Sequence, residues 1–312
     1  MDLKPQFVER MRLLLGKDYE NYEKILSQNY LNSIRCNTLK ISPDELKKRL
    51  SKKWTIKQLF PEHPEIMIIT SELEPGEIGR SLEHQLGYFY VQEVSSMMPP
   101  LVLEPKDDEN ILDLCASPGS KTTEIGALMK NKGNLIANDV SLGRIKILST
   151  NLQRCGVTNC IVAHHDGNNL ASRLNKLNFK FDKILVDAPC SGEGNVRTNK
   201  KTSKMFNEKL IKSMSNKQKQ LAGNVIKLLK EKGIMIYSTC THGPEENEEV
   251  VDYLLANFPV EVLDVKLPLK SRQGVTEWKG KKFHKDVVKC ARIYPQDNNT
   301  EGFFIAKLRR VR

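Results

Sequence analysis

The stretch "DLCASPGSKT" (residues 113–122) joins an apolar run to a loop of small residues. The run "ENILDL" (109–114) is typical of a buried strand, and only small residues occupy positions 117–120. Small residues let a ligand approach the backbone, and a helix starting near Thr122 would direct free N–H groups at a carboxylate or phosphate. We therefore expect a ligand-binding loop here.

A phosphate-binding P-loop is the first alternative, because "GSKT" resembles the end of that motif. The P-loop has the form Gly-x-x-x-x-Gly-Lys-Ser/Thr. Ser120 stands at the position of the second glycine, and the first glycine is also absent. The sequence therefore argues against a P-loop.

An acidic residue follows the loop at a sequence spacing that is typical of nucleotide-binding sheets. Asp139 lies 20 residues after Gly119, the spacing at which an acid meets ribose hydroxyls in nucleotide-binding sheets. The two features predict a nucleoside-containing ligand. At this point S-adenosylmethionine and a dinucleotide both remain open.

The pattern around this loop repeats from about residue 107 onward. Apolar strands alternate with helix-like segments, which indicates a parallel sheet with helices on both faces. The predicted strands are "ENILDL", "GNLIAND" (133–139), "NCIVAHHD" (159–166), "DKILVDAP" (182–189) and "GIMIYSTC" (233–240). The predicted helices are 122–131, 141–155, 207–231 and 244–258, the last opening at Pro244. Segments 261–268, 287–295 and 302–310 read as antiparallel strands added at the sheet edge.

The beginning of the chain predicts a small α+β module. "FVERMRLLLG" (7–16) is an amphipathic helix that Gly16 ends, and "SIRCNTLKI" (33–41) alternates like a strand. Ser42 caps a helix that begins at Pro43. Two short strands follow, "WTIKQLF" and "EIMIIT".

A connecting segment, "GYFYVQEVSSMMPPLVLEP" (87–105), predicts a short helix capped by Ser95 or Ser96 and ended by the two prolines. We therefore expect three parts: an α+β module at 1–75, a linker with a helix at 76–106, and an α/β, Rossmann-like domain at 107–312.

Composition limits the class of protein. The chain has 312 residues, of which 39% are hydrophobic and 28% charged, as in a soluble globular protein. Its apolar runs are shorter than the roughly 20 residues that span a bilayer, and its start is no secretory signal. Seven scattered cysteines favour reduced thiols and a cytoplasmic location. We expect no membrane association and a monomer.

Charge is unevenly distributed along the chain. Residues 191–232 and 266–312 carry net charges of +8 and +9, and residues 233–265 between them carry −7. Basic stretches around an acidic one fit a polyanion-binding surface that surrounds a site, and nucleic acid is the leading partner. A merely solvated face is the alternative. If nucleic acid lies across residues 197–232 and 266–312, neutralising Lys200, Lys201 and Lys204 together should reduce the salt dependence of binding.

Polar or reactive residues follow the predicted strands where ligands bind in open α/β sheets. Asp139, Asp166, Asp187 and Cys190 follow the second, third and fourth strands, and Cys240 follows the fifth. Neither thiol has a second cysteine or a histidine at ligand spacing, so we expect no metal.

The other thiols, Cys36, Cys155, Cys160 and Cys290, fit inert core positions. Cys190 and Cys240 instead border the cofactor loop. Beside a sulfonium, Lys121 and the loop N–H groups, we expect these two thiols to have a lowered pKa, as nucleophilic catalysis requires.

Four motifs together resemble the Nop/Sun-type RNA cytosine-5 methyltransferases: "DLCASPGSKT", "DAPCSGEG", "YSTCT" with "PEENE", and "GFFIAKL". "RCNTLK" and "GYFYVQEVSS" resemble the amino-terminal signatures of this family, so the resemblance covers nearly the whole chain. Ser117 and Ser120 stand where alanine and glycine are usual. The opening module resembles the RNA-recognition-like domain of the family.

The resemblance implies S-adenosylmethionine as cofactor and assigns the site residues. Asp139 would take the ribose hydroxyls with Arg144 nearby, and Asp166 the adenine amino group. The methionine part would be held by Cys115, Ala116, Ser117, Pro118, Gly119, Ser120 and Lys121.

The same resemblance implies that Asp187 lies beside cofactor and target base, that Cys240 is the nucleophile, and that Cys190 completes turnover. Addition of a thiolate at carbon 6 of cytosine makes carbon 5 nucleophilic, and a base must later remove the proton on carbon 5. The resemblance thus implies methylation of RNA, with tRNA favoured over rRNA.

Two other functions stay open. One is a catalytically silent RNA-binding protein on the same fold, which the two thiols and three acids argue against. The other is DNA cytosine methylation, in which Cys190 would be the nucleophile. Cys240 and the opening module favour RNA.

Overall fold

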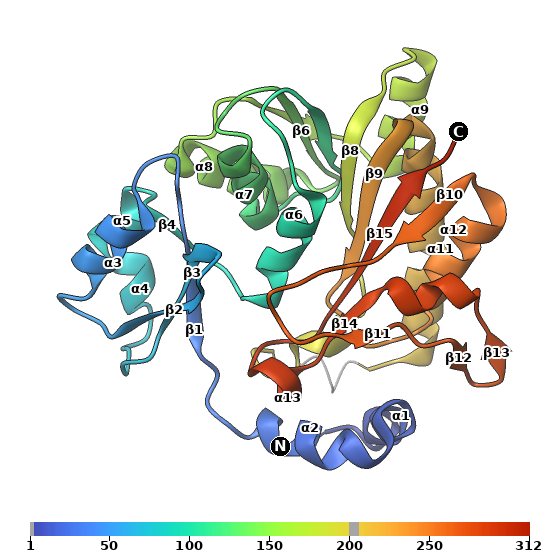
Figure 1. The fold of residues 1–312 in the computed structure, drawn as a ribbon, viewed down its shortest axis with the longest axis horizontal. Coiled ribbons are helices and arrows are strands. Elements are labelled where there is room, and N and C mark those ends of the chain that lie inside the picture. Colours follow the sequence, from blue (N-terminus) through green and yellow to red (C-terminus); the bar gives the residue numbers. More distant parts are fainter. Residues whose placement is uncertain (1–2, 200–205) are drawn as a thin grey trace. The chain divides into compact units, whose positions relative to one another are not determined.

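The computed structural model describes residues 3–199 and 206–312, and the chain divides into two compact units (Figure 1). One unit, called the cofactor unit below, comprises residues 31–185. The other, the thiol unit, comprises residues 1–30 and 186–312. These units cross the predicted boundaries at 75 and 107, because the first 30 residues pack with the carboxyl-terminal part of the chain.

The cofactor unit begins with a small antiparallel sheet of order β2-β3-β1-β4. The predicted order of strand, helix and two strands is confirmed, and a further strand at 89–91 completes the sheet. Its elements are β1 (Asn32–Cys36), α3 (Pro43–Leu50), β2 (Ile56–Phe60), β3 (His63–Ile69), α4 (Glu77–Arg80), α5 (Leu82–Gln85) and β4 (Phe89–Val91). Because β4 pairs with β1, this module extends beyond the predicted end at residue 75.

Local sequence signals explain two helix starts. The Ser42 hydroxyl accepts a hydrogen bond from the amide N–H of Glu45 at 3.3 Å, which confirms the predicted cap of α3. The prediction for Pro99 and Pro100 is wrong, because both lie in the first turn of α6 (Met98–Leu103) and do not end it. Proline lacks an N–H that the first turn would leave unpaired anyway, so it is tolerated there.

The cofactor unit also contains the parallel strands, with order β8-β5-β6-β7. The predicted alternation of strands and helices is confirmed. The elements are β5 (Asn110–Asp113), α7 (Ser120–Leu128), β6 (Asn134–Asp139), α8 (Leu142–Cys155), β7 (Cys160–His164), α9 (Gly167–Lys176) and β8 (Phe181–Asp187). The last two residues of β8 belong to the thiol unit.

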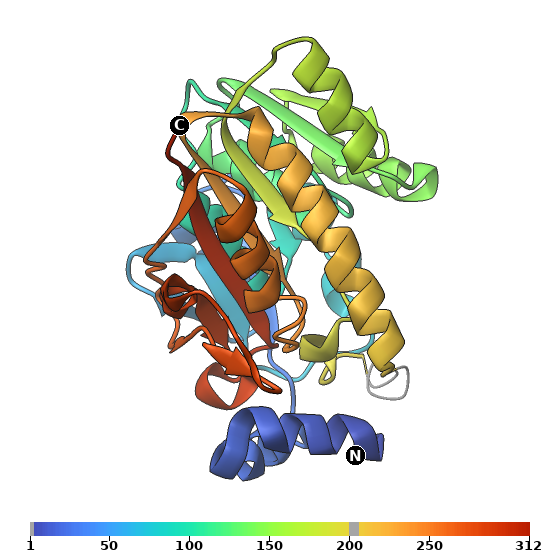
Figure 2. The ribbon, with the colours of Figure 1, turned by 90° about the vertical axis from the view of Figure 1, so that its right-hand side faces the viewer.

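Antiparallel strands form the sheet of the thiol unit, with order β11-β14-β15-β9 and β10 paired to β15. The predicted antiparallel tail is confirmed. Figure 2 shows α11 and α12 side by side over β9 and β15. The elements are α11 (Glu208–Val225), β9 (Leu229–Thr239), α12 (Glu248–Asn257), β10 (Val260–Leu263), β11 (Arg272–Gln273), β12 (Glu277–Trp278), β13 (Lys281–Lys282), β14 (Ala291–Ile293), α13 (Pro295–Asn298) and β15 (Phe303–Arg310).

Two predicted helix ends are wrong in this unit. The helix predicted over 207–231 ends at Val225, and β9 already begins at Leu229, because Leu228 and Leu229 are both buried. The helix predicted from Pro244 begins at Glu248 instead. The four residues before it form turns.

The amino-terminal helices α1 (Pro5–Leu15) and α2 (Tyr19–Leu26) belong to the thiol unit. Gly16 follows α1 with a φ of +56°, as predicted for a helix stop. The helices share a core with residues far along the chain: Phe7, Met11, Tyr19, Tyr22 and Leu26 pack with Val196, Phe206 and Ile211. Within residues 3–199 and 206–312, no helix is long and apolar enough to cross a membrane.

Candidate active site

The predicted ligand loop turns sharply into a helix. Gly119 precedes α7 with a φ of +104°, a backbone conformation that a side chain would strain. A Cβ there would also lie 3.0 Å from Cδ1 of Leu148. The helix begins at Ser120, two residues before the predicted start. The first N–H groups of a helix have no intrahelical partner, so they are available to an anionic ligand group.

Asp139 fixes the other side of this loop. Its side chain is almost fully buried at the end of β6, and its Oδ2 atom accepts a hydrogen bond from the Ser117 amide at 3.3 Å. Arg144 lies 3.4 Å from the same carboxylate, and its backbone carbonyl accepts the Ser117 hydroxyl at 2.8 Å. The structure therefore brings the predicted ribose acid, Arg144 and the loop together.

Two further predicted residues have defined partners in the cofactor unit. Lys121 is buried, and its ammonium donates to the Ser96 hydroxyl at 2.8 Å. Asp166 caps α9: its Oδ1 atom accepts from the amides of Asn168 and Asn169 at 3.0 and 3.2 Å. Asp166 thus orders the chain after β7.

The two predicted thiols meet in the thiol unit. The Sγ atoms of Cys190 and Cys240 lie 3.2 Å apart, well beyond the roughly 2.05 Å of a disulfide bond. The contact arises because the chain after β8 runs beside β9, where the Ala188 amide donates to the Ser238 carbonyl at 2.9 Å. The Ser238 hydroxyl donates to Asp187 Oδ1 at 2.8 Å. Asp187, Cys190 and Cys240 are therefore neighbours, as predicted.

The expectation of a lowered pKa is wrong for Cys190. Its hydrogen bond to Cys240, together with burial and the negative groups around it, raises the pKa of the Cys190 thiol well above its usual value. The raised pKa keeps the Cys190 thiol protonated near neutral pH.

Three of the predicted core thiols, Cys36, Cys155 and Cys290, are buried as expected, whereas Cys160 is only partly buried. Burial raises the pKa of Cys36 and of Cys160 to about 12, and it also raises the pKa of Cys155 and Cys290. A thiol with a raised pKa is a poor nucleophile near neutral pH. These four cysteines are free in the structure.

Gly194 holds the segment after Cys190 against Cys240. Its amide donates to the Cys240 carbonyl at 2.9 Å. A Cβ at Gly194 would lie 2.3 Å from the Gly302 carbonyl oxygen and 2.8 Å from that of Cys240. Glycine is needed at this position because the backbones approach too closely for any side chain.

Three residues of this site were missed by the sequence reasoning. Ser238 contacts Asp187, while Gln218 and Glu246 contact the backbone around Cys190. "YSTCT" and "PEENE" were noticed as motifs, but they indicated no role for Ser238 or Glu246. Gln218 lies within a basic helical stretch that gives no signal at all.

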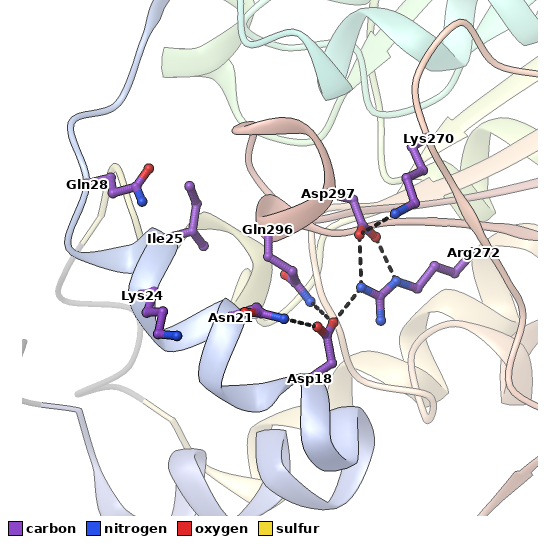
Figure 3. A pocket seen from close by; sticks show the side chains of 9 residues that line it. All are labelled: Asp18, Asn21, Lys24, Ile25, Gln28, Lys270, Arg272, Gln296 and Asp297. Atoms are coloured by element: carbon purple, nitrogen blue, oxygen red, sulfur yellow. Dashed lines mark hydrogen bonds and ion pairs between the residues drawn. The ribbon is translucent and has the colours of Figure 1, made fainter.

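Part of the predicted basic surface is neutralised within the thiol unit. Lys200, Lys201 and Lys204 lie outside the described residues. In the second basic stretch, Arg272 lies between Asp18 and Asp297, and Lys270 lies 3.3 Å from Asp297 (Figure 3). These residues line a pocket of about 430 Å³. Arg272 thus forms ion pairs within the protein. The net charge of the sequence therefore overstates the positive charge that is available to bind RNA.

Comparison with known proteins identifies the family. The model of the family described as "16S rRNA methyltransferase RsmB/F" matches residues 100–309, which include every predicted site residue. The chain belongs to the RsmB/F methyltransferase family. A second model, the N-terminal domain of 16S rRNA methyltransferase RsmF, matches residues 3–94. The resemblance to Nop/Sun-type enzymes is therefore confirmed, and the enzyme is a methyltransferase.

Relatives in the RsmB/F family include enzymes named for different RNAs. The chain is 41% identical to a tRNA (cytosine(49)-C(5))-methyltransferase of Pyrococcus abyssi, with all of both chains covered. It is 40% identical to ribosomal RNA small subunit methyltransferase F of Aliivibrio salmonicida, over 89% of this chain and 57% of that protein. The chain thus spans little more than half the length of the second relative.

Solved structures of similar proteins support the RsmB/F fold. A methyltransferase homologue from Pyrococcus horikoshii has a TM-score of 0.83 and 34% identity, with 99% of this chain and 100% of that chain covered. NSun6 from the same organism, solved with SFG, has a TM-score of 0.82 and 26% identity, with 99% and 98% covered. The predicted methyltransferase fold is confirmed.

S-adenosylmethionine, the cofactor of this family, fits the residues of the loop. The turn at Gly119 leaves the first amides of α7 available, which suits a carboxylate. The carboxylate of Asp139 suits hydroxyl groups. Among the described residues, no group of three or more His, Cys, Asp or Glu side chains could hold a metal ion.

Proposed function

We propose that this enzyme methylates carbon 5 of a cytosine in RNA, through a covalent bond from Cys240 that Cys190 helps to break. The observation that carries the proposal is the 3.2 Å contact between the two sulfurs beside Asp187. A single nucleophile would not need a second thiol in contact with it. A reaction with separate addition and elimination steps can use one thiol for each.

Cys240 performs the addition step. Its sulfur lies 3.2 Å from that of Cys190, and the thiolate of Cys240 is the proposed nucleophile. The thiolate forms a bond to carbon 6 of an extruded cytosine. The electrons of the double bond between carbons 5 and 6 move onto the ring toward nitrogen 3, and Asp187, acting as an acid, gives a proton to that nitrogen.

Cys190 performs the elimination step. S-adenosylmethionine, when bound, supplies the methyl group that carbon 5 receives. Cys190 first releases its own proton to water, and the resulting thiolate then takes the proton from carbon 5, directly or through water. That electron pair restores the double bond between carbons 5 and 6, and Cys240 leaves as a thiolate.

We assign cofactor binding to residues 115–121 with Asp139, Arg144, Asp166 and Asp187. Lys121 is assigned to the catalytic group, because its buried ammonium would favour negative charge at the site.

The proposed substrate is tRNA. Support comes from the tRNA methyltransferase of P. abyssi, which matches this chain from end to end. The rRNA enzymes match it over little more than half of their length. Ribosomal RNA is the second candidate, because both family models carry an rRNA name.

Bisulfite sequencing tests this proposal. Unmodified tRNA and rRNA transcripts are incubated with the protein and S-adenosylmethionine, and protected cytosines are located. We expect protection at defined positions of tRNA that requires both cofactor and Cys240. Protection confined to rRNA would transfer the proposal to the second candidate, and protection of neither would contradict it.

Asp139 provides a prediction on cofactor affinity. Replacing Asp139 with alanine removes the carboxylate proposed to bind the ribose and the acceptor of the Ser117 amide. We expect the binding of S-adenosylhomocysteine to weaken by roughly 1.5–3 kcal/mol, the scale of hydrogen bonds to a charged group. Calorimetry measures this, with Asp107→Ala at an exposed ion pair as the control. Unchanged affinity in the Asp139 variant, or tighter binding of NAD, would refute the cofactor assignment.

A further inference from the structure

Two buried polar side chains bracket Cys190 without touching its sulfur. Gln218, on α11, donates from its Nε2 atom to the Pro189 carbonyl at 2.9 Å. The same nitrogen donates to Glu246 Oε2 at 2.9 Å, and that oxygen also accepts the Ser191 amide at 3.0 Å. One amide and one carboxyl group therefore hold the backbone on both sides of Cys190.

Burying Gln218 and Glu246 costs free energy of folding, and packing alone does not explain why polar side chains occupy these positions. Gln218 and Glu246 both have an exposed fraction of 0%. In the part of the chain that the structure describes, Gln218 Oε1 and Glu246 Oε1 have no hydrogen-bond partner. An unpaired buried polar atom costs about 1–3 kcal/mol, so an apolar pair would be the more stable choice unless these groups serve the site.

Glu246 is itself anchored from a neighbouring strand. The Tyr237 hydroxyl, on β9, donates to the Glu246 backbone carbonyl at 2.5 Å. This bond keeps residues 244–247 out of the helix that the sequence predicts there. The carboxyl group consequently points toward the Cys190 segment and not toward solvent.

We propose that Gln218 and Glu246 form a clamp that positions Cys190 for the elimination step and, through the charge of Glu246, sets the pH at which Cys190 can accept the proton. The inference rests on the proposed role of Cys190. Both residues act through Cys190, so they are positioning residues.

The charge of Glu246 acts on Cys190 together with the other titratable groups that face it. Asp187 faces it from β8, Tyr237 lies on β9, and Cys240 and Glu246 follow that strand. The hydrogen bond with Cys240, burial, and the negative charges of Cys240, Glu246 and Asp187 raise the pKa of Cys190. Once Cys240 is bonded to the base, its sulfur carries no charge. Of the remaining charged groups, Glu246 then has the largest effect in raising the pKa of Cys190.

The pKa of Glu246 depends on its burial and on the groups around it. Burial raises the pKa of Glu246 to about 7, while the hydrogen bonds from Ser191 and Gln218 lower it. Glu193 and Arg10 act on it from further away as an ion pair whose atoms lie 3.0 Å apart. Glu246 is therefore largely ionised above neutral pH.

Two variants separate charge from position. Glu246→Gln keeps an oxygen that can accept both hydrogen bonds but removes the charge. Without that charge the pKa of Cys190 falls, so the midpoint of the elimination rate against pH is expected to move to lower pH by roughly one unit. Gln218→Met keeps the charge but releases Pro189, so elimination is expected to slow at least about tenfold at every pH with an unchanged midpoint.

The measurement is single-turnover methyl transfer to RNA, followed on a denaturing gel as the covalent complex forms and decays between about pH 6 and pH 10.5. Methyl transfer itself is expected to stay within about threefold of wild type in both variants, because Cys240 is untouched. Circular dichroism and S-adenosylhomocysteine binding verify that each variant is folded. Should Gln218→Met not fold, Gln218→Leu replaces it, because that change removes the donor without adding a charge beside Glu246.

Cys190→Ala, analysed in parallel, separates the failure of the clamp from the failure of the proposed function. If Cys190→Ala traps RNA while both clamp variants release it with the wild-type rate and midpoint, the clamp is refuted and the function stands. If Cys190→Ala traps no RNA, the role of Cys190 is refuted and the clamp with it. A midpoint that moves to lower pH in Glu246→Gln, with no such shift in Gln218→Met, is the result that supports the clamp.

Discussion

Cys190→Ala is expected to stop after methyl transfer, with RNA attached through Cys240. The variant retains the nucleophile, so the bond to carbon 6 forms and carbon 5 is methylated. It lacks the thiol that takes the proton from carbon 5, so Cys240 cannot leave. Denaturing gel electrophoresis should show a slowly migrating band that contains both protein and RNA.

Cys240→Ala is the matched control, because the two sulfurs lie 3.2 Å apart and each variant removes one of them. We expect no covalent complex and a loss of methyl transfer of at least about 10⁴-fold, the scale for removal of a catalytic nucleophile. A trapped complex in Cys240→Ala, with none in Cys190→Ala, would reverse the two roles. That outcome is the one expected of the DNA-type mechanism.

Glu248→Gln is expected to destabilise the protein strongly. Arg292 and Glu248 form a fully buried ion pair, in which Arg292 Nε donates to Glu248 Oε1 at 2.6 Å. Arg292 also donates to the His242 carbonyl at 2.9 Å, two residues beyond Cys240. Removing the carboxylate leaves a buried cation without its counter-charge, which costs about 3–5 kcal/mol. Urea denaturation followed by circular dichroism measures the change in the free energy of unfolding.

The control for this prediction is Glu261→Gln, which breaks the pair with Arg309. Both side chains of that pair are 43% exposed, so the change should cost less than about 1 kcal/mol. A double variant, Glu248→Met with Arg292→Leu, should recover much of the stability, because replacing both charges leaves neither buried alone. Equal costs for Glu248→Gln and Glu261→Gln would show that the buried pair contributes no more than an exposed one.

The strand-end residues were predictable because the parallel sheet imposes its own geometry. Apolar runs of strand length alternate with helices from residue 107, and such strands present their carboxyl ends at one edge. Asp139 and Asp187 could therefore be placed at strand ends without coordinates. The cap at Ser42 was equally local, since its partner lies three residues away.

The unit to which residues 1–30 belong and the start of the helix near Pro244 depend on contacts between residues far apart in the chain. Residues 1–30 carry a helical pattern that says nothing about where the helices pack, and their core partners are residues 196, 206 and 211. The helix predicted from Pro244 is interrupted because Tyr237 holds the Glu246 carbonyl and Glu246 holds the Ser191 amide. Helix propensity is a weak local preference that such contacts override.

By itself the sequence determined the alternating α/β pattern, the nucleoside-binding loop and the position of two particular thiols after strand ends. Residue type, spacing and strand alternation are local properties, so they can be read along the chain. Only the tertiary structure decided that the thiols touch, that Cys190 holds its proton, and that Gln218 and Glu246 grip its backbone. The pKa of Cys190 depends on burial and on charges brought from β8, β9 and the turns before α12, and distances across such elements exist only once the chain has folded.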